Sequence, residues 1–430
     1  MFLGPGFILV GSVVGSGEII LTSSLGSMTG FSMFWFVLLS CWSKNIVQAE
    51  LARFSVASGE SFLHAFNRLP GKLPAFRGKK VSWYLWFWFL WTLPELLSSG
   101  GQYGGAGQAL HSSRFGLRVV DGVGRRHSLC DHSDGDLPVS RKVPDDSGGN
   151  VHGHHGNLRR AAAADALCDN VAGSDGRVDV PLAGDGRRAA LACYAGTGVG
   201  SSEQMAYTYW CAEKGYARFA GPVDDSDDWV RRAKGWIKVM QTDAKLTLVL
   251  LTCATIPFYM LGAGVLYRLN QRPNGLETIS VLSNMYTETL GPWAFNLFLV
   301  GAFFVLFSTV VSGLGASSRV FADGMAAMGL IERNDYRTRV RILRAWALFK
   351  PTVAAFAYFL IQNPVWMLTI GNFFKTIKFP LMAGGAIYLH YRHLDKRVQP
   401  GWKADALLMI CAGIMVFLAL YIIYVKRFLW

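Results

Sequence analysis

Two glutamates stand in short motifs that match each other and that both lie within apolar stretches. Residues 11–18 read GSVVGSGE and residues 196–203 read GTGVGSSE, with identical residues at five of the eight positions. Ionisable side chains are costly inside membrane helices and usually have a function there. The carboxylates of Glu18 and Glu203 are therefore candidates to bind a cation or to carry a coupling proton.

Glycines run through both motifs, and they predict that each motif interrupts a helix. Glycine costs about 1 kcal/mol relative to alanine in a helix interior, and paired glycine-interrupted apolar segments are a sequence sign of a transport site. Unwound backbone also frees carbonyl oxygens that can hold a cation. Close helix packing on small residues is the alternative, but it leaves both glutamates unexplained. The predicted binding residues are Gly15, Ser16, Gly17, Glu18, Gly200, Ser201, Ser202, Glu203 and Gln204.

Other polar residues also stand within or beside apolar runs. Glu95 follows Pro94, which frees a backbone carbonyl, and this glutamate fits either a proton path or an interfacial position near a helix end. Lys44 is expected to extend along its helix toward the cytoplasmic surface. Arg319 and Asp323 are four residues apart, a spacing that predicts an ion pair along one helix face.

Composition places these motifs in a membrane protein. The chain of 430 residues is 51% hydrophobic, 13% aromatic and 17% charged, whereas soluble domains carry about 25% charged residues. These values exclude a disordered chain, a disulfide-rich secreted module and an ordinary cytosolic enzyme. Nine apolar runs long enough to span a bilayer predict an all-α polytopic fold, and they lie near residues 6–28, 31–52, 82–110, 190–210, 245–267, 293–317, 343–362, 366–390 and 404–425.

Basic residues gather in some of the connections between these runs. Lys and Arg are frequent in 53–80, 212–245, 318–345 and 391–403 and rare in the intervening connections. Basic connections stay on the cytoplasmic side, so we expect a cytoplasmic N-terminus in a cell membrane, plasma or inner. We attribute the net charge of +13 to contact with the lipid bilayer and expect no nucleic-acid partner.

Residues 112–193 differ from the rest of the chain. They contain a single aromatic residue, Phe115, and show neither helical nor strand periodicity. They are either a genuine polar insertion or a frameshifted stretch of a membrane gene, since a one-base shift turns the T-centred codons of large apolar residues into codons for Asp, Gly, Arg, His and Ser. The cluster His152, His154 and His155 looks like a metal motif, but under a frameshift it would be an accident of reading.

We therefore treat residues 1–430 as one transmembrane domain with three parts. Residues 1–111 hold the first three spans, residues 112–193 stand in place of two expected spans, and residues 194–430 hold the remaining six. No nucleotide-binding loop, dinucleotide fingerprint or Ser/His/Asp arrangement occurs outside the anomalous segment. The sequence does not predict an enzyme.

Two stretches resemble the Nramp family of divalent metal transporters. LGPGFILVGSVVGSGEIILTSSLG at residues 3–26 is similar to the first helices of that family, and GTGVGSSEQMAYTYWCAEKGYARF at residues 196–219 is similar to the sixth helix of a divergent branch. The resemblance covers residues 1–111 and 195–430. It implies the inverted-repeat fold shared with the amino-acid/sodium symporters, with eleven helices, of which nine are visible here. It also implies a divalent cation as cargo. We expect transport by alternating access, with or without proton coupling, and no resident cofactor.

The chain departs from the family at the metal ligands. The family's first broken helix carries Asp-Pro-Gly-Asn, where this chain has GSGE at 15–18, and its sixth helix carries Met-Pro-His, where this chain has SEQ at 202–204. Oxygen thus replaces sulfur and imidazole, which suits hard ions such as Mg²⁺ or Mn²⁺. The same fold carrying a different solute, or a non-functional truncated or frameshifted membrane protein, are the alternatives.

The span at 366–390 holds three further polar residues. Asn372 stands where the family adds a polar ligand, and the resemblance implies a binding role for it. Lys375 and Lys378 share a helix face and are expected to reach a lipid headgroup or to line a cavity, without binding a cation.

Overall fold

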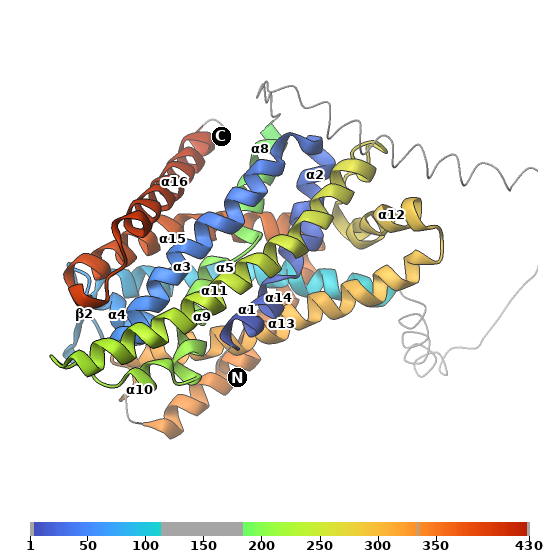
Figure 1. Cartoon of the computed structure of the whole chain (residues 1–430). Coiled ribbons are helices and arrows are strands. Elements are labelled where there is room, and N and C mark those ends of the chain that lie inside the picture. Colours follow the sequence, from blue (N-terminus) through green and yellow to red (C-terminus); the bar gives the residue numbers. More distant parts are fainter. Residues whose placement is uncertain (1–3, 113–183, 333–334, 428–430) are drawn as a thin grey trace, which may run out of the picture.

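Figure 1 shows the fold as a computed structural model, which describes residues 4–112, 184–332 and 335–427, with the backbone alone at 184, 185, 187, 188 and 422–427. Nearly all of these residues lie in helices. The strands among them, β1 (Lys72–Pro74) and β2 (Lys80–Ser82), pair antiparallel in one short hairpin. The described part of the chain is thus all-α apart from this hairpin.

Long helices form the body of the molecule. Seven described helices have 25 to 35 residues: α3 (Phe34–Ser58), α5 (Trp83–Ser112), α11 (Asp227–Leu261), α13 (Ala294–Ala327), α14 (Tyr336–Ile361), α15 (Pro364–Arg392) and α16 (Trp402–Arg427). The shorter ones are α1 (Pro5–Val13), η1 (Gly17–Thr22), α2 (Ser23–Thr29), η2 (Gly30–Met33), α4 (Phe62–Phe66), η3 (Phe76–Gly78), α8 (Gly184–Gly196), α9 (Ser201–Glu213), α10 (Tyr216–Ala220), η4 (Gly262–Leu266), η5 (Gly275–Glu277), α12 (Thr278–Leu290) and η6 (Lys396–Val398).

The helices have the length and surface of a membrane-embedded protein. Among the described residues, four stretches are long and apolar enough to cross a bilayer: Gly17–Ser58, Asp227–Leu266, Ala294–Ala327 and Trp402–Tyr421. Large apolar side chains also face outward, among them Phe304 at 63% exposed and Phe359 at 72%. Lipid accommodates such a surface, whereas water would favour its burial. The nine predicted apolar runs lie in helices, except where the runs 6–28 and 190–210 are each interrupted, and α12 is a helix that the apolar runs did not predict.

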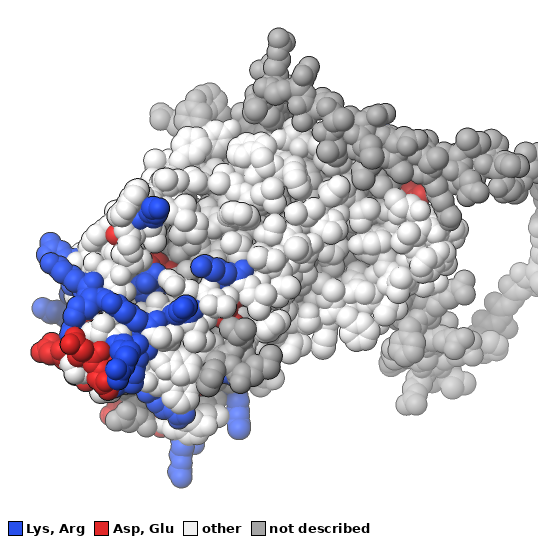
Figure 2. All heavy atoms as spheres, in the orientation of Figure 1, with Lys and Arg blue, Asp and Glu red and all other residues white. Residues whose placement is uncertain are grey.

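Charged side chains gather at one end of the molecule. On the face shown in Figure 2, Lys, Arg, Asp and Glu cluster around the end that carries α10 and the beginning of α11, and most of the remaining described surface is uncharged. A polar end next to a broad apolar belt is the pattern expected where a protein leaves the bilayer.

Both predicted helix interruptions are present. In the first, α1 ends at Val13 and the helix resumes at Gly17; in the second, α8 ends at Gly196 and α9 begins at Ser201. Gly198 has a φ of +65° in the second interruption, a left-handed conformation that favours glycine. We call residues 14–16 the first break and residues 197–200 the second break.

The surrounding helices hold the two breaks inside the molecule. α5 packs against α13, α14 and α15, while α3 packs against α9, α11 and α16. α8 lies against α15 and η1, and α1 lies against α11 and α13. The breaks are thus enclosed by protein, the setting in which irregular backbone is tolerated at membrane depth.

Candidate functional site

The two breaks lie side by side, and the residues that flank them touch. A Cβ built at Gly17 would lie 2.0 Å from the carbonyl oxygen of Gly196, so the backbones are in direct contact. Side chains reinforce this contact, since the hydroxyls of Thr22 and Thr197 lie 2.8 Å apart. The matching motifs, far apart in sequence, therefore form one junction.

Glu18 bridges the two breaks. Its Oε2 accepts a hydrogen bond from the backbone N–H of Gly15 at 3.0 Å, and its Oε1 accepts one from the N–H of Gly198 at 3.0 Å. The side chain is completely buried and does not line the cavity described below. Helix interruption leaves backbone N–H groups without helical partners, and hydrogen bonds to a charged acceptor are strong. Glu18 thus holds the two breaks together, a structural role that the motif at 11–18 did not indicate.

Lys44 of α3 supplies donors to the carbonyls at the second break. Its ammonium donates to the carbonyl oxygens of Tyr194 and Thr197, and the hydroxyl of Ser40 donates to the same two oxygens at 3.0 and 3.3 Å. The expectation that Lys44 extends toward the cytoplasmic surface is wrong, because the residue is completely buried. The last carbonyls of α8 carry the negative end of the helix dipole, which favours a cation there.

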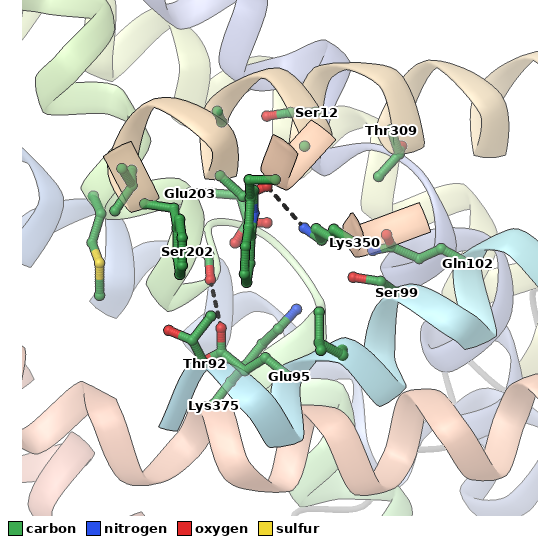
Figure 3. A pocket seen from close by; sticks show the side chains of 18 of the residues that line it. Ser12, Thr92, Glu95, Ser99, Gln102, Ser202, Glu203, Thr309, Lys350 and Lys375 are labelled. Atoms are coloured by element: carbon green, nitrogen blue, oxygen red, sulfur yellow. Dashed lines mark hydrogen bonds between the residues drawn. The ribbon is translucent and has the colours of Figure 1, made fainter. Parts of the chain in front are cut away.

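A cavity opens beside the junction, between α1, α5, α9, α13, α14 and α15 (Figure 3). Its volume of about 70 Å³ is enough for several water molecules. Its wall combines apolar side chains, among them Trp88, Trp210 and Trp346, with the polar residues labelled in the figure: Ser12, Thr92, Glu95, Ser99, Gln102, Ser202, Glu203, Thr309, Lys350 and Lys375. A smaller recess reaches from it between the breaks, past Ser16, Gly198 and Asn372.

Glu203 borders both the cavity and the recess. Its Oε2 is buried and makes no hydrogen bond to any described residue. A buried charged oxygen without a donor is unfavourable, so this atom is suited to a cationic or hydrogen-bonding ligand. Of the two motif glutamates, Glu203 is thus the one with an uncommitted oxygen at the cavity.

Glu95 also borders the cavity, but other side chains engage it. Its Oε1 lies 2.7 Å from the ammonium of Lys378, and its Oε2 accepts a hydrogen bond from Ser202 at 3.0 Å. These contacts connect α5 to α15 and α9. The sequence suggested a proton path or an interfacial position; the structure places Glu95 at the cavity wall, and a proton path stays a prediction.

The remaining predicted residues lie at or near the breaks. Asn372 is buried, its Oδ1 accepts from Ser98 at 3.5 Å, and a Cβ built at Gly196 would lie 2.5 Å from its Nδ2. Ser201 and Gln204 are buried on α9. Gln204 donates to the carbonyl of Lys44 at 3.2 Å, which ties α9 to α3.

Two lysines contribute positive charge to the cavity. Lys350 of α14 donates to Ser317 at 3.1 Å, and Lys375 of α15 borders both the cavity and the recess. A cavity position for Lys375 was one of two expectations from the sequence, whereas the position of Lys350 was not predicted. The signal in the sequence was a lysine directly before Pro351, in the middle of the apolar run at 343–362.

The expected ion pair between Arg319 and Asp323 is wrong, because each residue has partners on other elements. Arg319 instead pairs with Glu213 of α9 at 2.6 Å. Asp323 accepts hydrogen bonds from Ser61 at 2.6 Å and Tyr209 at 2.7 Å, and it lies 3.2 Å from Nδ1 of His64. Partners on neighbouring helices replaced the local one because α9 and the residues around α4 pack against this turn of α13.

The histidine cluster His152, His154 and His155 lies outside the described residues, as does most of the segment 112–193. The end of that segment, residues 184–193, begins α8. Within the described ranges, no group of three or more His, Cys, Asp or Glu side chains is arranged to hold a metal ion. A cation at the cavity would therefore rely on one free carboxylate with neutral oxygens and water.

Comparison with known proteins adds no assignment. No protein-family model matches the chain, and no curated protein matches it.

Proposed function

We propose that this protein is a secondary transporter that moves divalent cations across a cell membrane by alternating access. The observation that carries the proposal is the uncommitted carboxylate oxygen of Glu203, which borders the cavity where the two breaks meet. Substrate sites in secondary transporters lie at such junctions of discontinuous helices.

The lining favours a hard cation that keeps part of its water shell. Carboxylate, hydroxyl and amide oxygens surround the recess, with Ser16, Glu203 and Asn372 as the side-chain candidates. Mg²⁺ prefers oxygen ligands and commonly retains several waters, binding through one or two carboxylates. We therefore propose Mg²⁺ or Mn²⁺ as cargo, with Glu95 as the candidate for proton coupling.

The proposed architecture is the inverted repeat of the Nramp transporters and the amino-acid/sodium symporters. Support comes from the two matching motifs, each of which stands at a helix interruption, and from the contact between Gly17 and Gly196. The clustering of charge at one end (Figure 2) supports a cytoplasmic position for that end.

A second candidate function has its own observation. Lys350 and Lys375 bring two ammonium groups to the cavity that Glu203 borders. These positive charges repel a bare cation. These lysines favour a solute that carries a carboxylate, such as a zwitterion. The two candidates differ in the charge that must be present on the cavity wall.

Uptake into liposomes tests the proposal with the purified chain. Glu203→Gln keeps the shape of the side chain and removes its charge, so we expect Mg²⁺ and Mn²⁺ uptake to fall roughly 10- to 100-fold, the equivalent of one lost charge-assisted contact. Glu277→Gln, an exposed glutamate outside the cavity lining, is the matched control. Undiminished uptake by Glu203→Gln would reject the site.

Lysine variants separate the two candidates. If the cargo is a cation, Lys350→Gln and Lys375→Gln keep or increase metal uptake, because they remove repulsion. If the cargo is a zwitterion such as glycine, liposomes that contain the wild-type protein accumulate labelled glycine, and liposomes that contain either lysine variant do not. If the chain is non-functional, neither metal nor glycine is taken up. Metal uptake then appears only after the reading frame of residues 112–193 is restored.

A further inference from the structure

A basic groove lies away from the cavity, at the end of the molecule where charge gathers. It runs between α3, the first half of α11 and the residues around η6, with a volume of about 440 Å³. Its polar lining consists of Arg53, Lys234, Lys238, Gln241, Lys245 and Gln399, together with a threonine. No carboxylate is among the described residues that line it.

The lysines of the basic groove are not neutralised by neighbours. Lys234, Lys238 and Lys245 recur at helical spacing on α11, so they share one face, and all three are exposed. None of them forms an ion pair with a described residue. Arg53 at the base is buried and uses its Nε to contact Glu50 at 2.9 Å. The groove therefore presents a concentrated positive charge to whatever enters it.

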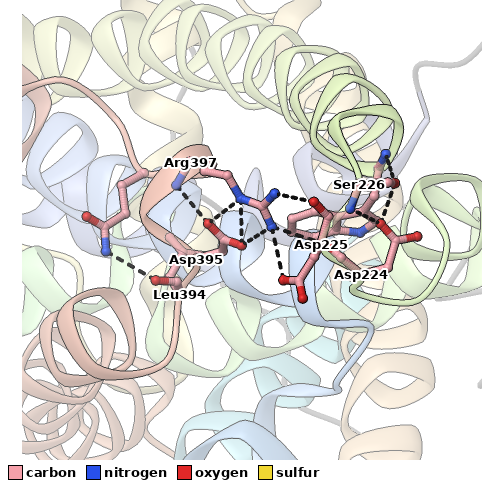
Figure 4. Close-up of polar contacts among 8 residues, drawn as sticks. Asp224, Asp225, Ser226, Leu394, Asp395 and Arg397 are labelled. Atoms are coloured by element: carbon pink, nitrogen blue, oxygen red, sulfur yellow. Dashed lines mark hydrogen bonds and ion pairs between the residues drawn. The ribbon is translucent and has the colours of Figure 1, made fainter.

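The wall formed by η6 is held in place by hydrogen bonds (Figure 4). Arg397 pairs with Asp395 at 2.7 Å and donates to the backbone carbonyls of Asp224 and Asp225 at 3.2 and 3.0 Å. Hydrogen bonds from Arg397 lower the pKa of Asp395, which keeps this carboxylate charged. Gln399 itself donates to the carbonyl of His390 at 2.9 Å. The loop is thus anchored before any ligand binds.

The basic groove stands at the border between polar and apolar surface. On α11, one turn beyond Lys245, Val249 is 58% exposed. Beyond η6, Trp402 is 75% exposed at the start of α16, and the apolar Leu407 and Ile410 are exposed further along that helix. Exposed tryptophan marks the headgroup level of a bilayer. A ligand in the groove would therefore have its charge at headgroup depth and apolar surface next to it.

From these observations we infer that the basic groove binds the phosphate headgroup of an anionic phospholipid. Clustered lysine and arginine beside membrane helices attract anionic lipids, and the adjacent apolar faces of α11 and α16 suit the acyl chains. A water-soluble phosphate compound would share the charge but would make no use of those faces. The inference does not depend on the cargo of the transporter.

Thermal unfolding of the full-length purified chain in non-ionic detergent tests the inference. We expect dioctanoyl phosphatidylglycerol to raise Tm in a saturable way, while dioctanoyl phosphatidylcholine, with equal chains and no net charge, does not. In the triple variant Lys234→Gln, Lys238→Gln, Lys245→Gln the midpoint should shift on the order of 100-fold to higher lipid concentration, since each lysine contributes about 1 kcal/mol. Lys238→Gln alone should shift it about fivefold.

A matched control removes the same charge elsewhere. Arg337→Gln, Arg339→Gln, Arg341→Gln takes three exposed cations from α14, and its lipid midpoint should equal that of the wild type. Equal shifts in both triple variants, or equal stabilisation by phosphatidylcholine, would overturn the inference. Stabilisation by inorganic phosphate at the same concentration as the lipid would overturn the lipid assignment in favour of a soluble phosphate compound. If the triple variant does not fold, the fivefold shift expected for Lys238→Gln alone tests the inference in the same way.

Discussion

Gly17 packs directly against the carbonyl oxygen of Gly196, and any Cβ at residue 17 would lie 2.0 Å from that oxygen. Because the neighbour is backbone, it cannot rotate away as a side chain would. The contact joins two segments that are 179 residues apart in sequence (196 − 17). A single substitution at residue 17 can therefore test whether the two breaks are in contact.

Gly17→Ala should therefore destabilise the protein. Overpacking of a tight interior typically costs about 1–3 kcal/mol, and here the methyl group would push the two breaks apart. Gly11→Ala, at a helix position with no atom within 4 Å of the added methyl, should be neutral or slightly stabilising. Thermal unfolding in detergent measures both, and equal Tm values for the two variants would contradict the close contact.

Lys44→Met should also destabilise the fold. Methionine has a similar length but cannot donate to the carbonyls of Tyr194 and Thr197, and buried acceptors that lose a partner cost about 1–3 kcal/mol each. The exposed Lys396 of η6 provides the control Lys396→Met, which should leave Tm nearly unchanged. A Lys44→Met protein with wild-type Tm would show that Ser40 alone satisfies these oxygens.

The two motif glutamates should separate stability from transport. Glu18→Gln places an amide where two N–H donors converge, so one donor loses its acceptor at a cost of about 1–3 kcal/mol, and Tm should fall. Glu203→Gln should leave Tm unchanged or higher, since its Oε2 has no donor among the described residues, while metal uptake falls. The assignment of roles would be reversed if Glu18→Gln kept its Tm and Glu203→Gln lost it.

Asp323→Asn should destabilise more than a comparable change at the surface. Asp323 accepts from Ser61 and Tyr209 in a partly buried setting, and hydrogen bonds to a charged group contribute about 1.5–3 kcal/mol each. Asp228→Asn removes exposed pairs with Arg231 and Arg232, where about 0–1 kcal/mol is typical. The comparison uses denaturant or thermal unfolding, and a larger effect at Asp228 would contradict it.

The parts of the fold that could be predicted from the sequence are those where local chemistry decides local structure. Glycine-rich motifs disfavour helix wherever they occur, so both interruptions were predictable from residues 11–18 and 196–203. Apolar runs likewise predicted the long helices. That both oxygens of Glu18 are engaged depends on the backbone N–H of Gly198, 180 residues away, and no local pattern carries that information.

Tertiary packing overruled local reasoning at the lysines and at the pair on α13. A lone lysine in an apolar run fits a helix end, but Lys44 is needed by carbonyls of another helix. A spacing of four residues allowed a pair between Arg319 and Asp323, yet Glu213 and Tyr209 on α9 offered both residues better partners. Charged groups within a packed bundle are satisfied by whichever helix faces them.

The two hydrogen bonds of Glu18 couple the two breaks mechanically. Because Glu18 lies on η1, beyond the first break, η1 cannot shift relative to the second break unless the amide of Gly198 is released from the carboxylate. Such a release costs about 1.5–3 kcal/mol, and a ligand that binds one conformation roughly 10- to 150-fold more tightly supplies that much. A weakly bound ligand with that preference would therefore be enough to break this hydrogen bond, and tight binding would not be required.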